Sequence, residues 1–226
     1  MIVVVASIHD ARALRIVAEW GSKSAAVLSA EDLCMPGWVF RVPIDPHTTA
    51  VIGGQKIPGE RISGILTLRP CIFPEELQDT QAAHRTYVAA ELNAFLLAWL
   101  TAQSSRVVNR PTACCLAGPN WRPEQWTQAA ARLDIPARTW RHIPSHNCIP
   151  NDGETLEVIT VGEQCFGCGD SGLREKSLKL AQAAGVELLS VRFSVDRTRF
   201  VSASAWPSLT DPAVLEAVRQ RLETPR

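Results

Sequence analysis

The residues of this chain best suited to chemistry are cysteines and histidines near its middle. Cys165 and Cys168 form a Cys-x-x-Cys motif that follows a β-branched run and precedes a helical pattern. A dithiol in such a place carries redox chemistry or supplies half of a zinc site. With His146 and Cys148 it would complete a Cys₃His set, which predicts a tetrahedral zinc site.

Two other interpretations of the Cys-x-x-Cys motif stay open. In the redox interpretation, the helix that follows lowers the pKa of Cys165. However, no aromatic residue precedes Cys165, and the Gly/Ser-rich turn 169–172 separates the dithiol from the helix. We therefore favour a structural turn, and the same turn could cradle an anion with its backbone amides.

Composition narrows the class of protein. The chain has 226 residues, 46% of them hydrophobic, and its 23 basic and 23 acidic residues give a net charge of zero. This balance predicts neither a nucleic-acid partner nor an acidic membrane surface as a partner. The longest apolar stretch, at 94–100, is too short to span a bilayer, and seven cysteines without a secretory signal predict reduced thiols. We expect a cytoplasmic protein.

The N-terminal part alternates strand and helix patterns. Residues 2–6 (IVVVA) predict a strand covered on both faces, as in a parallel sheet. Asp10 is expected to cap a helix whose apolar stripe is Ala11, Leu14 and Val17. His9, at the end of the first strand, is a ligand-binding candidate, because open α/β sheets bind ligands at the carboxyl ends of their strands. The further elements expected here are strands at 24–29, 37–43, 62–68 and 106–109, a loop or hairpin at 44–61, and helices at 83–101 and 123–133.

The C-terminal part follows an irregular segment at 141–154. Before this segment a short strand is expected at 134–140. The elements expected after it are a strand at 155–162, a helix at 173–185 closed by Gly185, two strands joined by a turn at 196–198, and a last helix after Asp211-Pro212. A parallel sheet with flanking helices, followed by a smaller α+β region, is the predicted architecture.

The order of these pieces resembles the ATP-grasp superfamily of carboxylate–amine ligases. VVNRP at 107–111 and RLDIPARTW at 132–140 resemble the end of its N-terminal domain. EVITVGEQCFG at 157–167 resembles a family hairpin, and the segment 180–209, ending in SASAWPSL, resembles its closing signature. The resemblance implies a pre-ATP-grasp-like α/β domain at 1–140 and a truncated C-terminal lobe at 155–226.

The resemblance also implies an activity, in which ATP phosphorylates a carboxylate and a nucleophile displaces the phosphate. Such chemistry depends on Mg²⁺ and cations that neutralise phosphate charge. Here Ser202 stands where the family has a metal-binding Glu, Ser204 where it has Asn, and Arg192 where it has an acidic residue. Arg192 would repel a metal and could hold an anion in its place.

The nucleotide-binding lobe of the family is largely missing from this sequence. No lysine lies between Lys56 and Lys176, whereas family members place two lysines on that lobe. About fifteen residues separate the IPART turn from the EVITVG strand, too few for several strands of about 5–6 residues each. The sequence therefore predicts a shortened and degenerate member.

Three hypotheses follow. The first is a non-catalytic protein that binds a partner protein, a peptide or a small anionic ligand, and that could act as an accessory to an ATP-dependent ligase. The second is a minimal ligase that uses ATP and Mg²⁺ and completes its site by oligomerisation. The third is a small zinc protein that uses the His/Cys set. For the first two hypotheses the ligand-binding candidates are His9, Asn109, Arg110, Arg138, Arg192, Ser202 and Ser204.

Overall fold

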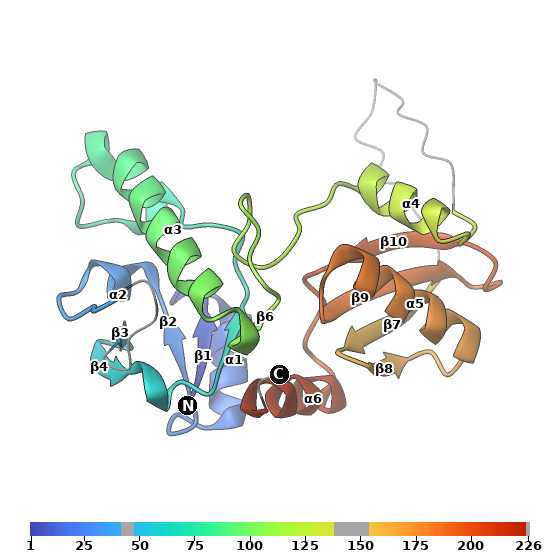
Figure 1. The fold of residues 1–226 in the computed structure, drawn as a ribbon, viewed down its shortest axis with the longest axis horizontal. Helices are drawn as coiled ribbons and strands as arrows, with labels where there is room; N and C mark the ends of the chain where they lie inside the picture. The colour runs from blue at the N-terminus through green and yellow to red at the C-terminus, as the bar shows by residue number, and fades with distance from the viewer. Residues whose placement is uncertain (42–47, 138–153, 225–226) are drawn as a thin grey trace. The chain divides into compact units, whose positions relative to one another are not determined.

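The computed structural model describes residues 1–41, 48–137 and 154–224. The chain forms two compact units, shown as a ribbon in Figure 1. Unit 1 comprises Met1–Pro119 with Val218–Arg226, and unit 2 comprises Asn120–Ala217. The division at 1–140 and 155–226 implied by the resemblance refers to family domains, and it stays a prediction.

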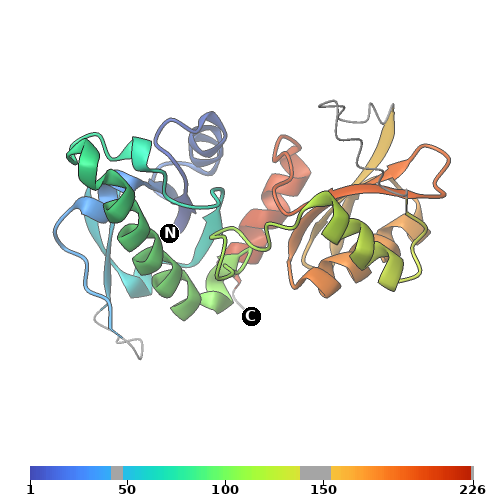
Figure 2. The same cartoon turned by 90° about the horizontal axis from the view of Figure 1, so that it is seen from above.

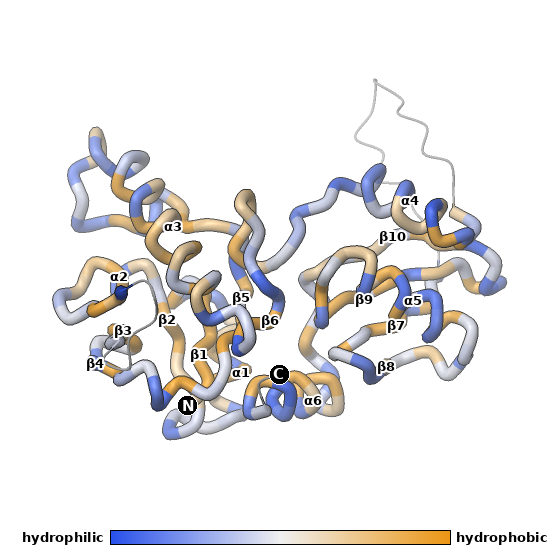
Figure 3. The backbone as a smooth tube through the Cα atoms, viewed as in Figure 1, coloured by the Kyte–Doolittle hydropathy of each residue, from blue (hydrophilic) through white to orange (hydrophobic). Residues whose placement is uncertain are grey.

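The sheet of unit 1 is a four-stranded parallel sheet in the order β2-β1-β5-β6 (Figure 1). Its strands are β1 (Ile2–Val5), β2 (Ala25–Leu28), β5 (Gly64–Thr67) and β6 (Val107–Val108). Every residue of β1 and β5 is buried, because helices cover the sheet. The expected open parallel sheet with flanking helices is confirmed, and Figure 3 shows its apolar strands in orange.

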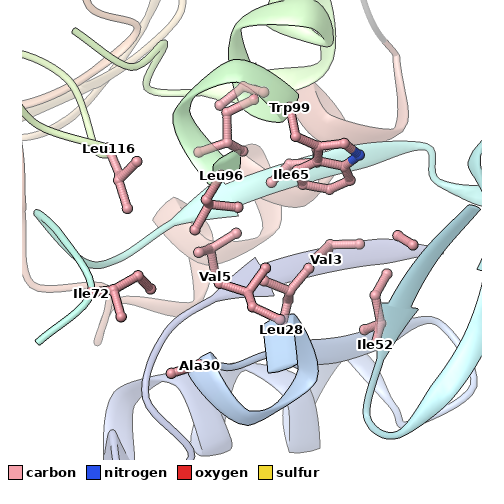
Figure 4. Packing of buried hydrophobic residues seen from close by; sticks show 14 of the residues in the cluster. Val3, Val5, Leu28, Ala30, Ile52, Ile65, Ile72, Leu96, Trp99 and Leu116 are labelled. Carbon is pink, nitrogen blue, oxygen red and sulfur yellow. The ribbon is translucent and has the colours of Figure 1, made fainter. Parts of the chain in front are cut away.

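Helix α3 packs against one face of this sheet. The helices of unit 1 are α1 (Ala11–Trp20), α2 (Ala30–Cys34) and α3 (Arg85–Ala102), with the short 3₁₀ turns η1 (Gly59–Arg61), η2 (Pro74–Glu76), η3 (Ala82–His84) and η4 (Ser104–Arg106). Leu96 and Trp99 of α3 belong to one buried cluster with Val3 and Val5 of β1 (Figure 4). Figure 2 shows α3 across the sheet from a second direction.

Helix α6 (Pro212–Glu223) packs closely on the sheet of unit 1 at Gly64. A Cβ atom placed on Gly64 would lie 2.4 Å from the carbonyl oxygen of Leu222 and 2.6 Å from its Cβ. Only glycine therefore lets the last helix approach β5 this closely.

A β-hairpin lies beside α2 and is fixed to it by a buried carboxylate. The hairpin pairs β3 (Thr49–Ile52) with β4 (Gln55–Pro58), as expected for this segment. Asp32 accepts hydrogen bonds from the backbone N–H groups of Gly53 (3.1 Å) and Gly54 (2.8 Å) in the hairpin turn. It also accepts one from the N–H of Ser29, so the start of α2 and the turn share one acceptor.

Two predictions for unit 1 are wrong. The buried stripe of α1 is formed by Ala13, Ile16 and Trp20, whereas Leu14 of the expected stripe is 50% exposed. The strand expected at 37–43 is reduced, within the described residues, to one bridge between Val39 and Thr49.

The sheet of unit 2 is antiparallel, in the order β10-β9-β7-β8 (Figure 1). Its strands are β7 (Thr155–Val161), β8 (Gln164–Gly167), β9 (Leu188–Ser194) and β10 (Phe200–Ser204), and its helices are α4 (Pro123–Arg132) and α5 (Ser171–Ala184). Of the strand expected at 134–140, Ala137 makes a single bridge to Phe200, and residues 138–140 lie outside the described part. The smaller α+β region is confirmed.

One face of this sheet packs against α4 and α5. Val158, Val191 and Phe193 point to this face and share a buried cluster with Trp126 of α4 and Leu180 of α5. Side chains alternate along a strand, so the intervening residues point to the other face. In the part of the chain that the structure describes, no helix is long and apolar enough to cross a membrane.

Candidate functional site

The second face of the unit 2 sheet carries a row of polar side chains across three strands. In the strand register, Glu157 of β7 lies opposite Arg192 of β9, and Arg192 lies opposite Ser202 of β10. Ser190 and Ser204 are opposite each other in the neighbouring row. Residues two apart on a strand share a face, so all five side chains are on the side away from α4 and α5.

The carboxylate of Glu157 is engaged by its neighbours. The hydroxyl of Ser190, which is 4% exposed, donates a hydrogen bond of 2.6 Å to Oε1 of Glu157. Nε of Arg192 lies 3.7 Å from the same oxygen, and the Arg192 side chain is 56% exposed. The guanidinium can therefore pair with Glu157 and still present donors to a ligand.

A cavity of about 280 Å³ opens over this polar face. The strands supply the five polar residues described above and Ala203, and the segment after β10 supplies Trp206, Pro207 and Ser208. The N–H of Trp206 donates to Oγ of Ser204 (3.1 Å), so two of the residues that line the cavity are hydrogen-bonded to each other. The structure thus brings together three of the predicted residues, Arg192, Ser202 and Ser204.

The groups in this cavity do not fit Mg²⁺. Magnesium needs hard anionic oxygens in octahedral geometry. The cavity has one carboxylate, which already interacts with Ser190 and Arg192, and the other oxygens are serine hydroxyls. Within residues 1–41, 48–137 and 154–224, no three His, Cys, Asp or Glu side chains are grouped to hold a metal ion. The cavity therefore presents a cation and hydroxyls, a set of groups that does not suit Mg²⁺.

The Cys-x-x-Cys motif lies at the edge of the same sheet and not in a loop before the helix. Cys165 is within β8, opposite Thr160, and the N–H of Cys168 donates to the carbonyl oxygen of Glu157 (3.1 Å). Gly167 between them has φ +87°, and a Cβ there would lie 2.4 Å from that same carbonyl. Both thiols pack against the buried cluster of unit 2.

The environment of Cys165 disfavours thiolate chemistry. Burial raises the pKa of Cys165, and the nearby Arg174 only partly opposes this effect. A raised pKa leaves less of the nucleophilic thiolate, so a redox-active dithiol is not favoured here. The other two members of the predicted zinc set, His146 and Cys148, lie outside the described residues, so the zinc site stays a prediction.

The turn before α5 is not an open anion cradle. Asp170 is the N-cap of α5, and its carboxylate accepts a hydrogen bond of 3.0 Å from the N–H of Leu173. It also pairs with Arg197 (3.1 Å) from the β9–β10 turn. The pKa of Asp170 is lowered, first by the Leu173 hydrogen bond, so a carboxylate already occupies this helix terminus.

The remaining candidates lie in unit 1. His9 follows β1 and is exposed, with its N–H donating to Oγ of Ser7 (3.3 Å). Asn109 and Arg110 follow β6, where Asn109 is 2% exposed and Arg110 is exposed. These three residues share the carboxyl edge of the parallel sheet, with β5 between their strands. Arg138 lies outside the described residues.

Glu157 is the one charged residue of the cavity that sequence reasoning missed. Its signal was present, because side chains alternate along a strand, which places Glu157 on the face opposite Val158. Its partners belong to β9, 33 residues later for Ser190, and no local pattern specifies that register.

Comparison with known proteins supports the fold. No protein-family model matches the chain, and no curated protein matches it in sequence. Among solved structures, the macrocyclase MdnC of Microcystis aeruginosa MRC, bound with its precursor peptide MdnA, is similar with a TM-score of 0.66. The sequence identity is 11%, and the match covers 98% of this chain and 99% of MdnC.

Two further ligases are similar over their whole lengths. The ATP-grasp ligase PsnB, complexed with minimal precursor, Mg and ADP, has a TM-score of 0.60 at 12% identity, covering 99% of this chain and 98% of PsnB. A RiPP-associated ATP-grasp ligase of Chryseobacterium gregarium, in complex with ADP and a leader and core peptide, has a TM-score of 0.63 at 11% identity, covering 100% and 97%. The resemblance found in the sequence is confirmed for the fold: this chain has the fold of RiPP-associated ATP-grasp ligases.

Proposed function

We propose that this protein is a non-catalytic ATP-grasp-like protein that binds a peptide, as an accessory to an ATP-dependent ligase. The observation that carries the proposal is the cavity on the unit 2 sheet, which Arg192, Ser202 and Ser204 line. The resemblance to the ATP-grasp superfamily implies that these three residues stand where its members have acidic and amide groups. A cation and hydroxyls hold an anionic group well and a divalent metal poorly.

The peptide class is suggested by the similar structures. MdnC is described bound with a precursor peptide, PsnB in complex with a minimal precursor, and the Chryseobacterium gregarium ligase in complex with a leader and core peptide. In our proposal the present protein retains peptide binding and has lost phosphoryl transfer. The missing lysines between Lys56 and Lys176 support the loss, because phosphate charge would stay unneutralised.

The test distinguishes peptide binding from phosphoryl transfer. Short peptides encoded beside the gene are synthesised with a fluorescent label, and their binding is followed by fluorescence polarisation with and without ATP·Mg. We expect binding that ATP·Mg does not change, no heat on titration of ATP·Mg alone, and no ADP release with peptide present. Peptide-dependent ADP release would overturn the proposal in favour of the minimal ligase.

Matched arginine variants locate the peptide. Arg192→Ala should weaken peptide binding about fivefold, because an exposed charged contact contributes about 1 kcal/mol. Arg199→Ala, an exposed arginine of the β9–β10 turn, should leave binding unchanged. Equal effects of the two substitutions would place the peptide outside the cavity.

A further inference from the structure

Two opposite charges line the cavity on the unit 2 sheet, and the proposed function uses only the positive one. Glu157 and Arg192 lie directly opposite each other on β7 and β9. The side chain of Glu157 is 38% exposed and that of Arg192 is 56% exposed, and both residues line the cavity. The other residues of the lining are neutral, so the formal charges of the cavity lining sum to zero.

The negative charge of Glu157 remains available to act on a ligand. Within the described residues its carboxylate has two contacts, the hydroxyl of Ser190 at 2.6 Å and Nε of Arg192 at 3.7 Å, and both involve Oε1. A distance of 3.7 Å is too long for a hydrogen bond, so Arg192 keeps its donors for a ligand. The hydroxyl of Ser190 holds the carboxylate on the open face without neutralising it.

An anion bound by Arg192 therefore lies within the electric field of Glu157. Neighbouring strands are about 4.8 Å apart, whereas salt at about 0.1 M screens charges only beyond about 10 Å. The repulsion between Glu157 and the ligand is proportional to the charge of the ligand. A carboxylate has one negative charge, whereas a phosphorylated side chain has about 1.5–2 at pH 7, with acceptor oxygens only.

A second negative charge on the ligand gains no net attraction here, because the charges of the cavity lining sum to zero. It still costs more free energy to remove from water. We propose that Glu157 makes the cavity selective for a single carboxylate and excludes phosphate groups. This inference rests on the proposed function, in which the cavity binds an anionic group of a peptide, and it specifies which anion is bound.

Each polar group of the cavity then has a distinct part in recognition. Arg192 and the hydroxyls of Ser202 and Ser204 donate hydrogen bonds to the carboxylate of the ligand. Glu157 opposes any further negative charge. The cavity volume of about 280 Å³ lies near the lower limit of about 300 Å³ for ligand pockets, so it suits one acidic side chain or one peptide C-terminus.

The experiment compares three capped amino acids and observes Arg192 directly. N-acetylglutamic acid α-amide has a side-chain carboxylate, N-acetylglycine has a terminal carboxylate, and N-acetyl-O-phosphoserine amide has a phosphate. Each is titrated at pH 7 and constant ionic strength into the full-length protein labelled with ¹⁵N. The Nε–H signal of Arg192, assigned by its loss in Arg192→Ala, is followed by NMR.

We expect a carboxylate probe to shift this signal to saturation, and the phosphoserine probe to bind about threefold or more weakly. The tighter of the two carboxylate probes shows whether the cavity takes an acidic side chain or a peptide C-terminus. This comparison uses the parent protein alone, so it decides the proposal even if a variant at Glu157 does not fold.

Glu157→Gln removes the charge and keeps an oxygen that accepts from Ser190. The phosphoserine probe should bind this variant about tenfold more tightly than the parent, and the carboxylate probe about threefold more tightly, because the repulsion is proportional to ligand charge. Glu175→Gln is the matched control. It removes an exposed carboxylate on α5, which packs against the opposite face of the sheet, and should change neither affinity.

Three results would overturn the proposal. The first is phosphoserine binding to the parent as tightly as the better carboxylate probe. The second is a Glu157→Gln variant in which both affinities rise by the same factor. The third is an Arg192 signal that no probe shifts. Failure of the proposed function alone looks different, because the labelled peptides would then not bind while a carboxylate probe still shifted the Arg192 signal.

Discussion

The two sheets of this protein differ in how their faces are used. In unit 1 the strands β1 and β5 are buried along their whole length, and polar candidates such as His9 and Asn109 follow the strands. In unit 2 one face packs against helices, and the other presents Glu157, Arg192 and Ser202. A sheet covered on both faces can present ligand-binding side chains only at the ends of its strands, whereas a half-covered sheet can present them on its open face.

The same difference is visible in the sequence patterns. IVVV in β1 has no polar position, while TLEVITV in β7 and LLSVRFS in β9 insert Glu157, Ser190 and Arg192 between apolar residues. The inserted residues meet because the strands pair in register. The comparison gives two predictions. A larger side chain on the covered sheet of unit 1 should lower the stability of the fold. A change of charge on the half-covered sheet of unit 2 should mainly alter ligand binding.

The largest effect is expected at the covered sheet. Gly64→Ala introduces a Cβ within 2.4–2.8 Å of Leu222 atoms, two of which belong to the backbone of α6. The helix must shift to relieve this overlap, so we expect the free energy of unfolding to fall by about 1–3 kcal/mol. Urea denaturation followed by circular dichroism measures the change.

Gly169→Ala is the matched control for this substitution. A Cβ on Gly169 meets nothing within 4 Å, and its backbone is not in the left-handed region. Its unfolding free energy should stay within about 0.5 kcal/mol of the parent protein. If Gly64→Ala were equally silent, the close approach of α6 to the parallel sheet would be wrong.

Much of the fold could be predicted from local patterns. The strand at 2–6, the long helix at 83–101 and the Gly185 cap each have a strong local signal, and all three are present. Helix α2 was missed because it has five residues, although Ser29 and Asp32 form a capping box that marks its start. Short helices lack the apolar periodicity that reveals long ones.

The error at α1 has a different physical origin. In α1 apolar residues occupy both candidate stripes, so helical spacing alone could not show that Ile16 and not Leu14 faces inward. In the same way, Pro70 and Leu116 lie far apart in the sequence and are joined by a backbone hydrogen bond. Contacts between segments distant in the sequence depend on sheet order, which one sequence does not specify.

A smaller effect is expected on the half-covered sheet. Ser190→Ala removes a 2.6 Å hydrogen bond to Glu157 from a residue that is almost completely buried, and should lower the unfolding free energy by about 1 kcal/mol. Arg192→Ala removes only an exposed ion pair at 3.7 Å and should lower it by less than about 0.5 kcal/mol. Urea denaturation of both variants at one pH and salt concentration gives the comparison.

The ranking of these two variants is informative for the proposed function. A small stability effect at Arg192, together with weaker peptide binding, would assign the arginine to ligand recognition. A stability loss at Arg192 equal to or above that at Ser190 would instead make the Glu157–Arg192 pair a structural element of the sheet. The polar face of the unit 2 sheet would then stabilise the fold, as the buried residues of the unit 1 sheet do.

The smallest effect concerns the turn that joins β9 and β10, two of the three strands of the polar face. The pKa of Asp196 is lowered from 3.8 to about 2, first by the hydroxyl of Ser194 and then by the side chain and N–H of Thr198. Because the folded state holds the ionised form, this contribution to stability is present above about pH 4 and is lost as the pH falls toward 2. Carboxyl NMR titration should give a midpoint near 2 for Asp196.

Thr198→Val gives the matched test, since it removes one donor to Asp196 and keeps the carboxyl. The titration midpoint should move up from about 2 toward 3.8, and unfolding between pH 4 and pH 2 should depend less on pH. Asp196→Asn should remove this part of the pH dependence. If the titration midpoint of Asp196 is unchanged in Thr198→Val, the side chain of Thr198 does not stabilise the ionised carboxylate. The hydrogen-bonded turn between β9 and β10 would then be wrong as described. Because Arg192 and Ser202 belong to those two strands, their common row depends on that turn.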